Sequence, residues 1–377
     1  RLNKMFVKSD KEYRLMFDHM IQKQTNHLLN EIKNSKDLEN KIIGCTAIIL
    51  TGLCYKINKN YLEIGLSFLK KITVSSIDNQ GFTRSRSIKQ LIFFLKYFVL
   101  IREWFKEAQV EVPDHIEENI YYFGQGYAFI RQNIATDLLF NGNNKSNTYD
   151  LDNYLKRLGY KFKNENKDYG GYIILKNKKI CLAMDAGSSP NSKYTHDYQS
   201  GALSFEIISN GKKLITNCGY YKKNNQNLNE ISKSSAVHST LIIDDNSSCK
   251  FTKKKDKLIL KSGLKITQRN SVYEKNYWKI NAAHDGYLKK FKSIHERNIE
   301  FFPEQMKFVG NDKIIRKKNN HNLKFDIRFH LEPNIKLMKT QDNKSILIEL
   351  DEEGWKFTCD NYDINIDNGL YFGDKNS

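Results

Sequence analysis

The sequence has few of the features that would fix a fold covalently or anchor a chain in a membrane. It contains four Pro and six Cys in 377 residues, and no two cysteines form a C-x-x-C pair. A zinc ribbon or a redox motif is therefore not expected. Disulfides stay open, but a chain of this length can bury a core without them. The main apolar runs, residues 42–55 and 91–101, are too short to span a membrane and predict buried helices.

No signal segment of charged, apolar and small residues opens the chain, which begins at Arg1. Because the chain starts at Arg1, we expect the sequence to be a piece of a longer protein, and the missing signal segment then says little about its location. No pattern in the sequence indicates its oligomeric state.

Negative charge is scarce relative to positive charge. There are 61 Lys and Arg against 43 Asp and Glu, which leaves a formal net charge of +18. Such a balance suits an acidic partner: nucleic acid, an anionic membrane surface or a polyanionic glycan. The alternative is compositional, because a chain rich in Asn, Lys and Ile carries lysine wherever a surface tolerates it. No basic and aromatic motif accompanies the lysines, so we do not expect a nucleic-acid partner.

The hydrophobic pattern changes once along the chain. Up to about residue 140 the apolar residues recur at helical spacing, and Pro113 followed by Asp114 marks one helix start. Beyond residues 141–144 (N-G-N-N), short β-branched and aromatic runs alternate with Asn, Asp, Gly and Lys turns. This order predicts an α+β chain with a helical domain over residues 1–145 and an antiparallel β-sandwich over residues 146–377.

Several short motifs follow one another in the same two regions. They are G-F-T-R-S-R-S at Gly81–Ser87, M-D-A-G at Met184–Gly187, A-L-S-F-E at Ala202–Glu206, S-S-A-V-H-S-T-L-I-I-D-D at Ser234–Asp245, A-H-D-G-Y at Ala283–Tyr287 and R-F-H-L-E-P at Arg328–Pro333. Each is weak alone, but their order resembles that of the heparinase II/III-like family. The resemblance covers roughly residues 70–377 and implies a partial (α/α) toroid followed by a β-sandwich.

The resemblance also implies a function. Members of this family include lyases that cleave acidic polysaccharides by β-elimination, in which a base takes the C5 proton of a uronic acid while its carboxylate is neutralised. We therefore expect a polysaccharide lyase with an acidic polysaccharide as partner, in the cell envelope or periplasm. The alternative is a non-catalytic protein on the same scaffold that binds glycans or serves envelope assembly.

The motifs single out candidate site residues. The candidates for proton transfer are His196, Tyr198, His238 and His284. Arg84 and Arg86 lie in a polar turn and could clamp a substrate carboxylate through their guanidinium groups. Gln199 and Asn217 are further candidates for substrate binding. Structural alternatives stay open for each, such as a histidine that serves the core of the sandwich.

The departures from the family pattern concern its metal site. The loop before L-S-F-E usually carries two histidines, and alignment on Gly201 places Asp197 and Gln199 at those positions. Asn217 stands where the family has a carboxylate ligand, so that His238 is the remaining ligand type. Zinc needs three or four thiolate, imidazole or carboxylate ligands. We therefore expect no metal and no cofactor in this protein.

Overall fold

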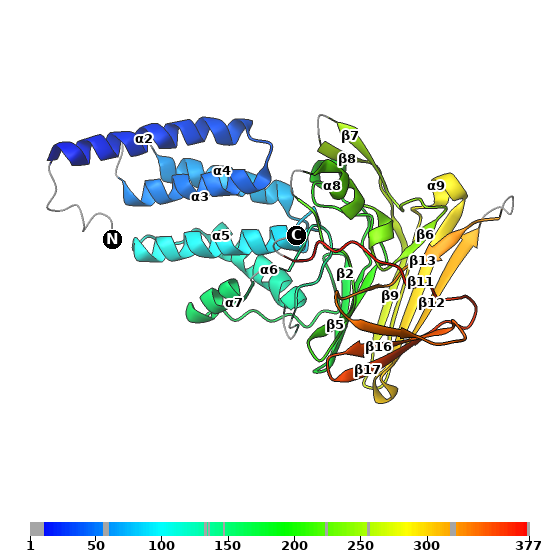
Figure 1. The fold of residues 1–377 in the computed structure, drawn as a ribbon. Helices are drawn as coiled ribbons and strands as arrows, with labels where there is room; N and C mark the ends of the chain where they lie inside the picture. Colours follow the sequence, from blue (N-terminus) through cyan, green and yellow to red (C-terminus); the bar gives the residue numbers. More distant parts are fainter. Residues whose placement is uncertain are drawn as a thin grey trace. The chain divides into compact units, whose positions relative to one another are not determined.

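The structure is a computed structural model that describes residues 11–55, 60–131, 134, 136–145, 148–222, 225–254, 257–316 and 322–374. The chain divides into two compact units (Figure 1). The first comprises Arg1–Gly81 and Gln90–Gly124, and the second comprises Phe82–Lys89 and Gln125–Ser377. The division into domains at residue 145 stays a prediction, and the two units are described separately below.

The first unit is helical, as the periodicity predicts. It contains α2 (Lys11–Asn34), α3 (Leu38–Cys54) and α4 (Tyr61–Ser76), most of α5 (Ile88–Glu107) and the first part of α6 (Asp114–Arg131). Asp37 and Asn60 cap α3 and α4 by accepting hydrogen bonds from backbone N–H groups of the first turn. Helix α3 packs against both α2 and α4. The predicted start of a helix at Asp114 is confirmed.

The second unit contains the turn of residues 82–89, the end of α6 and α7 (Thr148–Arg157), and then becomes antiparallel β-structure. One sheet has the order β1-β2-β3-β4-β5-β14 and another the order β12-β11-β10-β9. The bounds are β1 (Asp168–Tyr169), β2 (Tyr172–Lys176), β3 (Ile180–Asp185), β4 (Phe205–Ser209), β5 (Lys212–Thr216), β14 (His330–Leu331), β9 (Ile266–Tyr273), β10 (Trp278–His284), β11 (Ser293–Phe302) and β12 (Lys307–Arg316). The predicted α+β class, helices followed by antiparallel sheets, is confirmed.

Smaller sheets and short helices complete the second unit. The sheets are β6 (Leu241–Ile243) with β13 (Phe325–Ile327), β7 (Lys250–Lys254) with β8 (Lys257–Ser262), and β15 (Lys336–Lys339) with β16 (Ser345–Leu350) and β17 (Glu353–Thr358). The helices are η1 (Ser192–Tyr194), α8 (Gln226–Ser232), η2 (Ser235–Val237), α9 (Leu288–Phe291) and η3 (Pro303–Gln305).

The core of the second unit lies between the two large sheets. Strand β3 is buried along its whole length, whereas β11 alternates between buried and half-buried positions, as expected for a strand with one face on the core. Side chains of β2–β5, β10, β11 and β16, including Trp278, form one apolar cluster. Between β4 and β5, Asn210 and Gly211 both have positive φ, 44° and 82°, as a two-residue hairpin turn requires.

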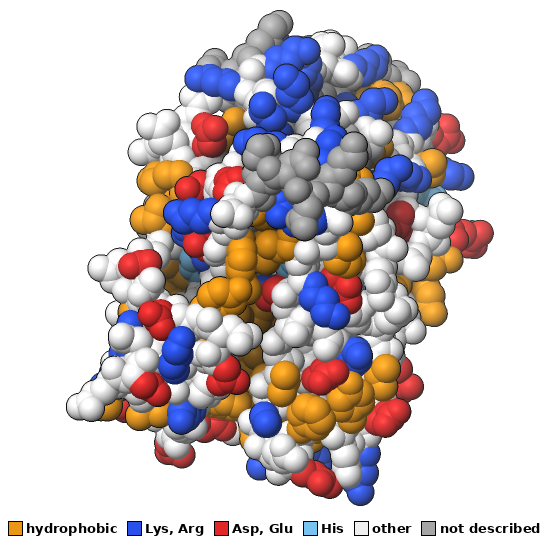
Figure 2. All heavy atoms as spheres, turned by 90° about the vertical axis from the view of Figure 1, so that its right-hand side faces the viewer, with side chains coloured by type: hydrophobic (Ala, Val, Ile, Leu, Met, Phe, Trp, Pro, Cys, Tyr) orange, Lys and Arg blue, Asp and Glu red, His pale blue; other side chains and the backbone are white. Residues whose placement is uncertain are grey.

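The structure shows the state of the cysteines, the character of the helices and the distribution of charge. All six cysteines lie within the described residues and have free thiols. None of the described helices is long and apolar enough to cross a membrane. On the face drawn in Figure 2, Lys and Arg side chains gather toward the upper end, while acidic side chains are interspersed lower down. The excess of positive charge is therefore unevenly spread over this face.

Candidate functional site

The loop of residues 191–201 carries three of the predicted site residues, His196, Tyr198 and Gln199. The buried side-chain amide of Gln199 attaches the loop to the rest of the second unit. The Gln199 side chain is fully buried and accepts a hydrogen bond from the Gly142 N–H at 3.0 Å. Its Nε2 donates to the Gly219 and Ser232 carbonyls at 2.9 and 2.6 Å. One side chain thus joins three segments that are distant in sequence, and it fixes the loop on the sandwich.

His196 and Asp197 form a hydrogen-bonded pair at the outer side of this loop. Their Nδ1 and Oδ1 atoms are 2.6 Å apart, and the side chains are 61% and 9% exposed, respectively. Because a carboxylate can only accept, the neutral imidazole carries its hydrogen on Nδ1 and keeps the lone pair of Nε2. Burial would raise the pKa of Asp197, but His196 and nearby lysines lower it overall. The pair therefore presents a basic nitrogen on an oriented ring.

Two lysines lie near the Asp197 carboxylate. Lys222 is exposed, and its charge helps to lower the pKa of Asp197. Lys233 is buried and donates to the His196 and Tyr198 carbonyls at 2.5 and 3.1 Å. Burial lowers the pKa of Lys233 to about 8, although the Asp197 charge opposes this shift. The neighbourhood of the pair is thus rich in positive charge.

Arg86 is buried within the second unit, whereas Arg84 is exposed. The Arg86 guanidinium pairs with Asp185 and donates to the Gly187 and Gly171 carbonyls at 2.9 and 3.0 Å. A Cβ at Gly187 would lie 2.3 Å from the guanidinium carbon, so the glycine of the M-D-A-G turn makes room for this side chain. These interactions of Arg86 fix the turn of residues 82–89 on the sandwich.

A chain of hydrogen bonds joins this turn to the loop of His196. Asp185 accepts from Arg86 and, at 2.9 Å, from the Asn141 amide. The Asn141 side-chain oxygen in turn accepts from the Gln199 N–H at 3.3 Å. The segment that carries Arg84 is therefore tied, through buried groups of one unit, to the segment that carries the exposed imidazole.

His238 lies at the entry to β6 and is 1% exposed. Neither of its ring nitrogens makes a well-formed hydrogen bond with a described residue. Burial lowers the pKa of His238 to about 3, the charge of His330 adds to this effect, and an interaction with the Ser232 backbone opposes it. The imidazole is therefore neutral, and the fold encloses it.

Asn217 directly follows β5 and is fully buried. Its side-chain amide forms hydrogen bonds with neighbouring groups. Its Nδ2 donates to Glu206 at 3.2 Å, and its Oδ1 accepts from the Ser239 N–H at 3.0 Å. Glu206 also accepts from Lys213 at 2.7 Å, in an ion pair whose two side chains are 0% and 1% exposed. The Asn217 amide thus completes a buried network on β4 and β5.

His284 belongs to a second buried network, on β10, β11 and β12. The Gly286 N–H donates to its Nδ1 at 3.0 Å, so its hydrogen is on Nε2, which lies 3.2 Å from Nδ1 of His295. Nε2 of His295 then donates to Asp312 at 2.6 Å, and Arg297 pairs with the same carboxylate at 2.8 Å. Burial lowers the pKa of His284 and of His295. Both ring nitrogens of His284 and both of His295 therefore have a partner in this network.

Tyr198 is buried on the inner side of the same loop as His196. It is 1% exposed, and its hydroxyl accepts a hydrogen bond from Ser189 at 2.9 Å. Burial raises the pKa of the phenol well above its ordinary value. Of the eight predicted site residues, therefore, His196 and Arg84 are exposed and the other six are buried. Their action on a substrate stays a prediction.

Comparison with known proteins identifies the scaffold. Residues 164–377 match the family model described as heparinase II/III-like, C-terminal, and so more than half of the chain is covered. The chain belongs to the heparinase II/III-like family. No curated protein has a significantly similar sequence.

Two solved structures show the same fold as this heparinase II/III-like chain. A crystal structure of heparinase III matches with a TM-score of 0.69 and 15% identity, over 92% of this chain and 58% of that one. A mutant of the heparan sulfate lyase HepC from Pedobacter heparinus matches with a TM-score of 0.66 and 12% identity, over 87% and 53%. The chain thus spans a little over half the length of these proteins.

The positions at which the sequence resemblance places the metal ligands of the family are occupied here by other groups. The described residues contain no group of three or more His, Cys, Asp and Glu side chains that could hold a metal ion. The amides of Gln199 and Asn217 are used by backbone groups and by Glu206. This donor set does not fit a zinc ion, and the absence of zinc from the protein stays a prediction to be measured.

The roles of Asp197 and of the two lysines were not foreseen from the sequence. The sequence places Asp197 at a histidine position of the family, whereas its pairing with His196 depends on the shape of the loop. Gly142 approaches Asp197 so closely that a Cβ there would lie 2.4 Å from the Asp197 Cβ. Lys233 could have been found, because alignment on His238 places it at the arginine that opens the family's R-S-T-A-A-H motif.

Proposed function

We propose that this protein is a polysaccharide lyase that cleaves a uronic-acid-containing polysaccharide by β-elimination, with His196 as the base. The observation that carries the proposal is the exposed imidazole whose Nδ1 is held at 2.6 Å by the nearly buried Asp197. Membership of the heparinase II/III-like family supports the reaction class. The names of the structural matches, heparinase III and heparan sulfate lyase, support an acidic polysaccharide as substrate.

The chemistry follows from the orientation of the ring. Nε2 of His196 takes the C5 proton of the uronic acid, the C4–O bond breaks, and a double bond forms between C4 and C5. The Asp197 carboxylate stabilises the imidazolium that results, because it is the hydrogen-bond partner of Nδ1. The imidazolium is then the acid that returns a proton to the departing oxygen.

Elimination also requires that the substrate carboxylate be neutralised, since the C5 proton is otherwise poorly acidic. Lys222 lies near enough to Asp197 to lower its pKa and is exposed. Arg84 is exposed on the turn that the Arg86–Asp185 pair holds. We assign carboxylate binding to these two cations. The net charge of +18 would draw a polyanion to the surface by long-range attraction.

The alternative function is glycan binding or envelope assembly without catalysis. The observation that favours it is the replacement of metal ligands by amides, Gln199 and Asn217, that are committed to the fold. Location in the cell envelope or periplasm is part of both proposals and rests on the family alone. Fractionation of the source cells followed by immunodetection would test it.

The experiment is a set of incubations with acidic glycans, in which the ultraviolet absorbance of the unsaturated product is followed. If the protein is a lyase, His196→Ala should lower the rate roughly 10²–10⁴-fold, the usual contribution of a proton-transfer group. His27→Ala is the matched control, because His27 is exposed on α2 and belongs to no network described above. Equal rates for His196→Ala and the wild type would refute the role of His196. Saturable binding of a glycan without any product would favour the alternative.

A further inference from the structure

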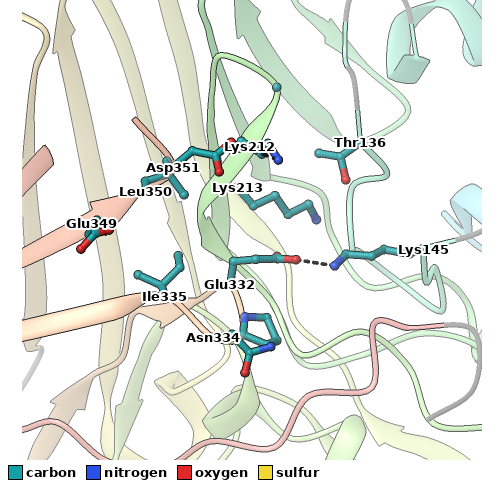
Figure 3. Close-up of a pocket in the computed structure, with 12 residues that line it drawn as sticks. Thr136, Lys145, Lys212, Lys213, Glu332, Asn334, Ile335, Glu349, Leu350 and Asp351 are labelled. Atoms are coloured by element: carbon teal, nitrogen blue, oxygen red, sulfur yellow. Dashed lines mark hydrogen bonds and ion pairs between the residues drawn. The ribbon is translucent and has the colours of Figure 1, made fainter. Parts of the chain in front are cut away.

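Two lysines are buried among the described residues, and the protein uses their ammonium groups in different ways. Lys213, on β5, pairs with the buried carboxylate of Glu206 at 2.7 Å. It lines a pocket together with Lys145 and Glu332 (Figure 3). An ion pair of this kind satisfies the charges of the fold. Lys233 directly follows α8, and its ammonium instead binds backbone carbonyls of the loop of residues 191–201.

Lys233 holds the backbone on both sides of Asp197. Its Nζ donates to the His196 carbonyl at 2.5 Å and to the Tyr198 carbonyl at 3.1 Å. These two residues flank Asp197 in the chain. The backbone carbonyl of Lys233 in turn accepts from the Ser200 N–H at 2.9 Å. Lys233 thus bonds to the loop at three points, and they enclose the segment that carries the His196–Asp197 pair.

Two aromatic rings lie beside the Lys233 ammonium. The ring centroids of Tyr220 and Phe251 are 5.2 and 5.1 Å from Nζ, within the range of a cation–π interaction. The Tyr220 hydroxyl also donates to the His196 carbonyl at 3.2 Å. Phe251 belongs to β7, and Tyr220 follows β5 in the chain. The ammonium is therefore held in place by segments other than the loop whose carbonyls it binds.

The charge of Lys233 acts on the Asp197 carboxylate as well. Burial would raise the pKa of Asp197, but its hydrogen bond with His196 and the positive charges around it, that of Lys233 included, lower it overall. Burial lowers the pKa of Lys233 to about 8, against the effect of the Asp197 charge. Most molecules therefore still carry the ammonium at pH 7. Lys233 thus favours the ionised Asp197, which is the form that accepts from Nδ1 of His196.

The orientation of Asp197 decides which nitrogen of His196 carries the hydrogen. Either nitrogen of a free neutral imidazole can carry it, whereas a carboxylate that faces Nδ1 selects Nδ1. Neighbouring side chains in a loop face one another only while the backbone between them is held. We propose that Lys233 is a positioning residue, which orients Asp197 toward His196 and thereby keeps Nε2 of His196 as the basic nitrogen. Its effect on turnover rests on the proposed lyase function, whereas its effect on the tautomer does not.

The test reads the tautomer of His196 by long-range proton–nitrogen NMR on the full chain, near neutral pH and without substrate. The His196 signals are those that His196→Ala lacks. We expect the hydrogen on Nδ1 in the wild type. Lys233→Met removes the donors and the charge at similar side-chain length, and it should give a mixture of the two tautomers. Lys233→Arg should restore the wild-type pattern, because a guanidinium supplies both donors and charge.

Lys176→Met is the matched control. Lys176, on β2, is half-buried, and its Nζ also donates to a backbone carbonyl, that of Phe129 outside the loop, at 3.4 Å. The tautomer of His196 should stay that of the wild type in this variant. The buried rings of His284 and His295 give signals in the same spectra, and unchanged signals there show that a variant is folded.

A second variant guards against a folding defect in Lys233→Met. Lys233→Gln keeps two N–H donors without the charge. It takes the place of Lys233→Met if the signals of His284 and His295 change in that protein. Its ratio of tautomers should lie between those of the wild type and of a protein with a free imidazole.

Elimination rates separate the role of Lys233 from the lyase function. If the protein is a lyase, Lys233→Met should lower kcat about 10- to 100-fold, the scale of a misplaced catalytic group, and change KM less than about 3-fold. The proposal is overturned if the folded variant keeps the wild-type tautomer, if Lys176→Met changes it equally, or if Lys233→Arg does not restore it. A tautomer that depends on Lys233 in a protein without elimination activity would support the positioning role and refute the lyase function.

Discussion

Acid should destabilise this protein in part through one buried imidazole, that of His238. Burial lowers its pKa from 6.5 to about 3 in the folded chain, and unfolding restores the ordinary value. Between these two pH values the unfolded chain binds a proton that the folded chain does not bind. The contribution to stability is therefore complete above pH 6.5 and is lost as the pH falls toward 3.

The size of this effect follows from the pKa difference. At about 1.4 kcal/mol per unit, the neutral His238 accounts for about 4 to 5 kcal/mol in total and about 3 kcal/mol between pH 7 and pH 4. His238→Gln has no group that titrates in this range. Its free energy of unfolding should therefore fall less steeply with acid than that of the wild type, by up to that amount.

The assay is urea unfolding followed by tryptophan fluorescence at pH 7, 5 and 4 for both proteins. His284, His295 and His330 also have lowered pKa values, but they are present in both proteins and cancel in the difference. His27→Gln serves as the control for a lost exposed imidazole. If the wild type and His238→Gln lose the same free energy between pH 7 and pH 4, the imidazole is not held neutral by burial and the reasoning fails.

Three further predictions concern Arg86, Gly142 and zinc. Arg86→Gln should lower the free energy of unfolding by about 3 to 5 kcal/mol, because it leaves Asp185 buried without its partner, whereas Arg84→Gln should change it by less than about 0.5 kcal/mol in urea titrations. Gly142→Ala should cost about 1 to 3 kcal/mol and slow any elimination, because φ is +83° and the new Cβ would press on Asp197; unchanged stability would contradict this. Elemental analysis should find no stoichiometric zinc, and a chelator should leave the melting temperature unchanged; about one zinc per chain would refute the expectation.

Local patterns predicted much of the fold because helices and strands have characteristic periods. The apolar run of residues 42–55 lies almost wholly in α3, and the run of residues 91–101 lies in α5. The change of pattern after residue 145 was likewise followed by antiparallel strands. These features depend on neighbours within a few residues, and such neighbours are visible in the sequence.

The accessibility of the candidate site residues could not be predicted in this way. His238 and His284 stand at breaks between strand patterns, where an exposed and a buried histidine look alike. Their burial depends on partners such as Ser232 and Asp312, and the pairing of Arg86 depends on Asp185, 99 residues later. The periodicity of the sequence does not predict contacts between residues so far apart in the chain.

The order of the helices and strands and the motifs that identify the family were determined by the sequence. Only the tertiary structure decided that Gln199 and Asn217 serve the backbone, that Arg86 is enclosed, and that His196 keeps a free nitrogen on its exposed ring. The physical reason is that the cost of burying a polar group depends on the partners it finds there. Those partners come from segments that only the folded chain brings together.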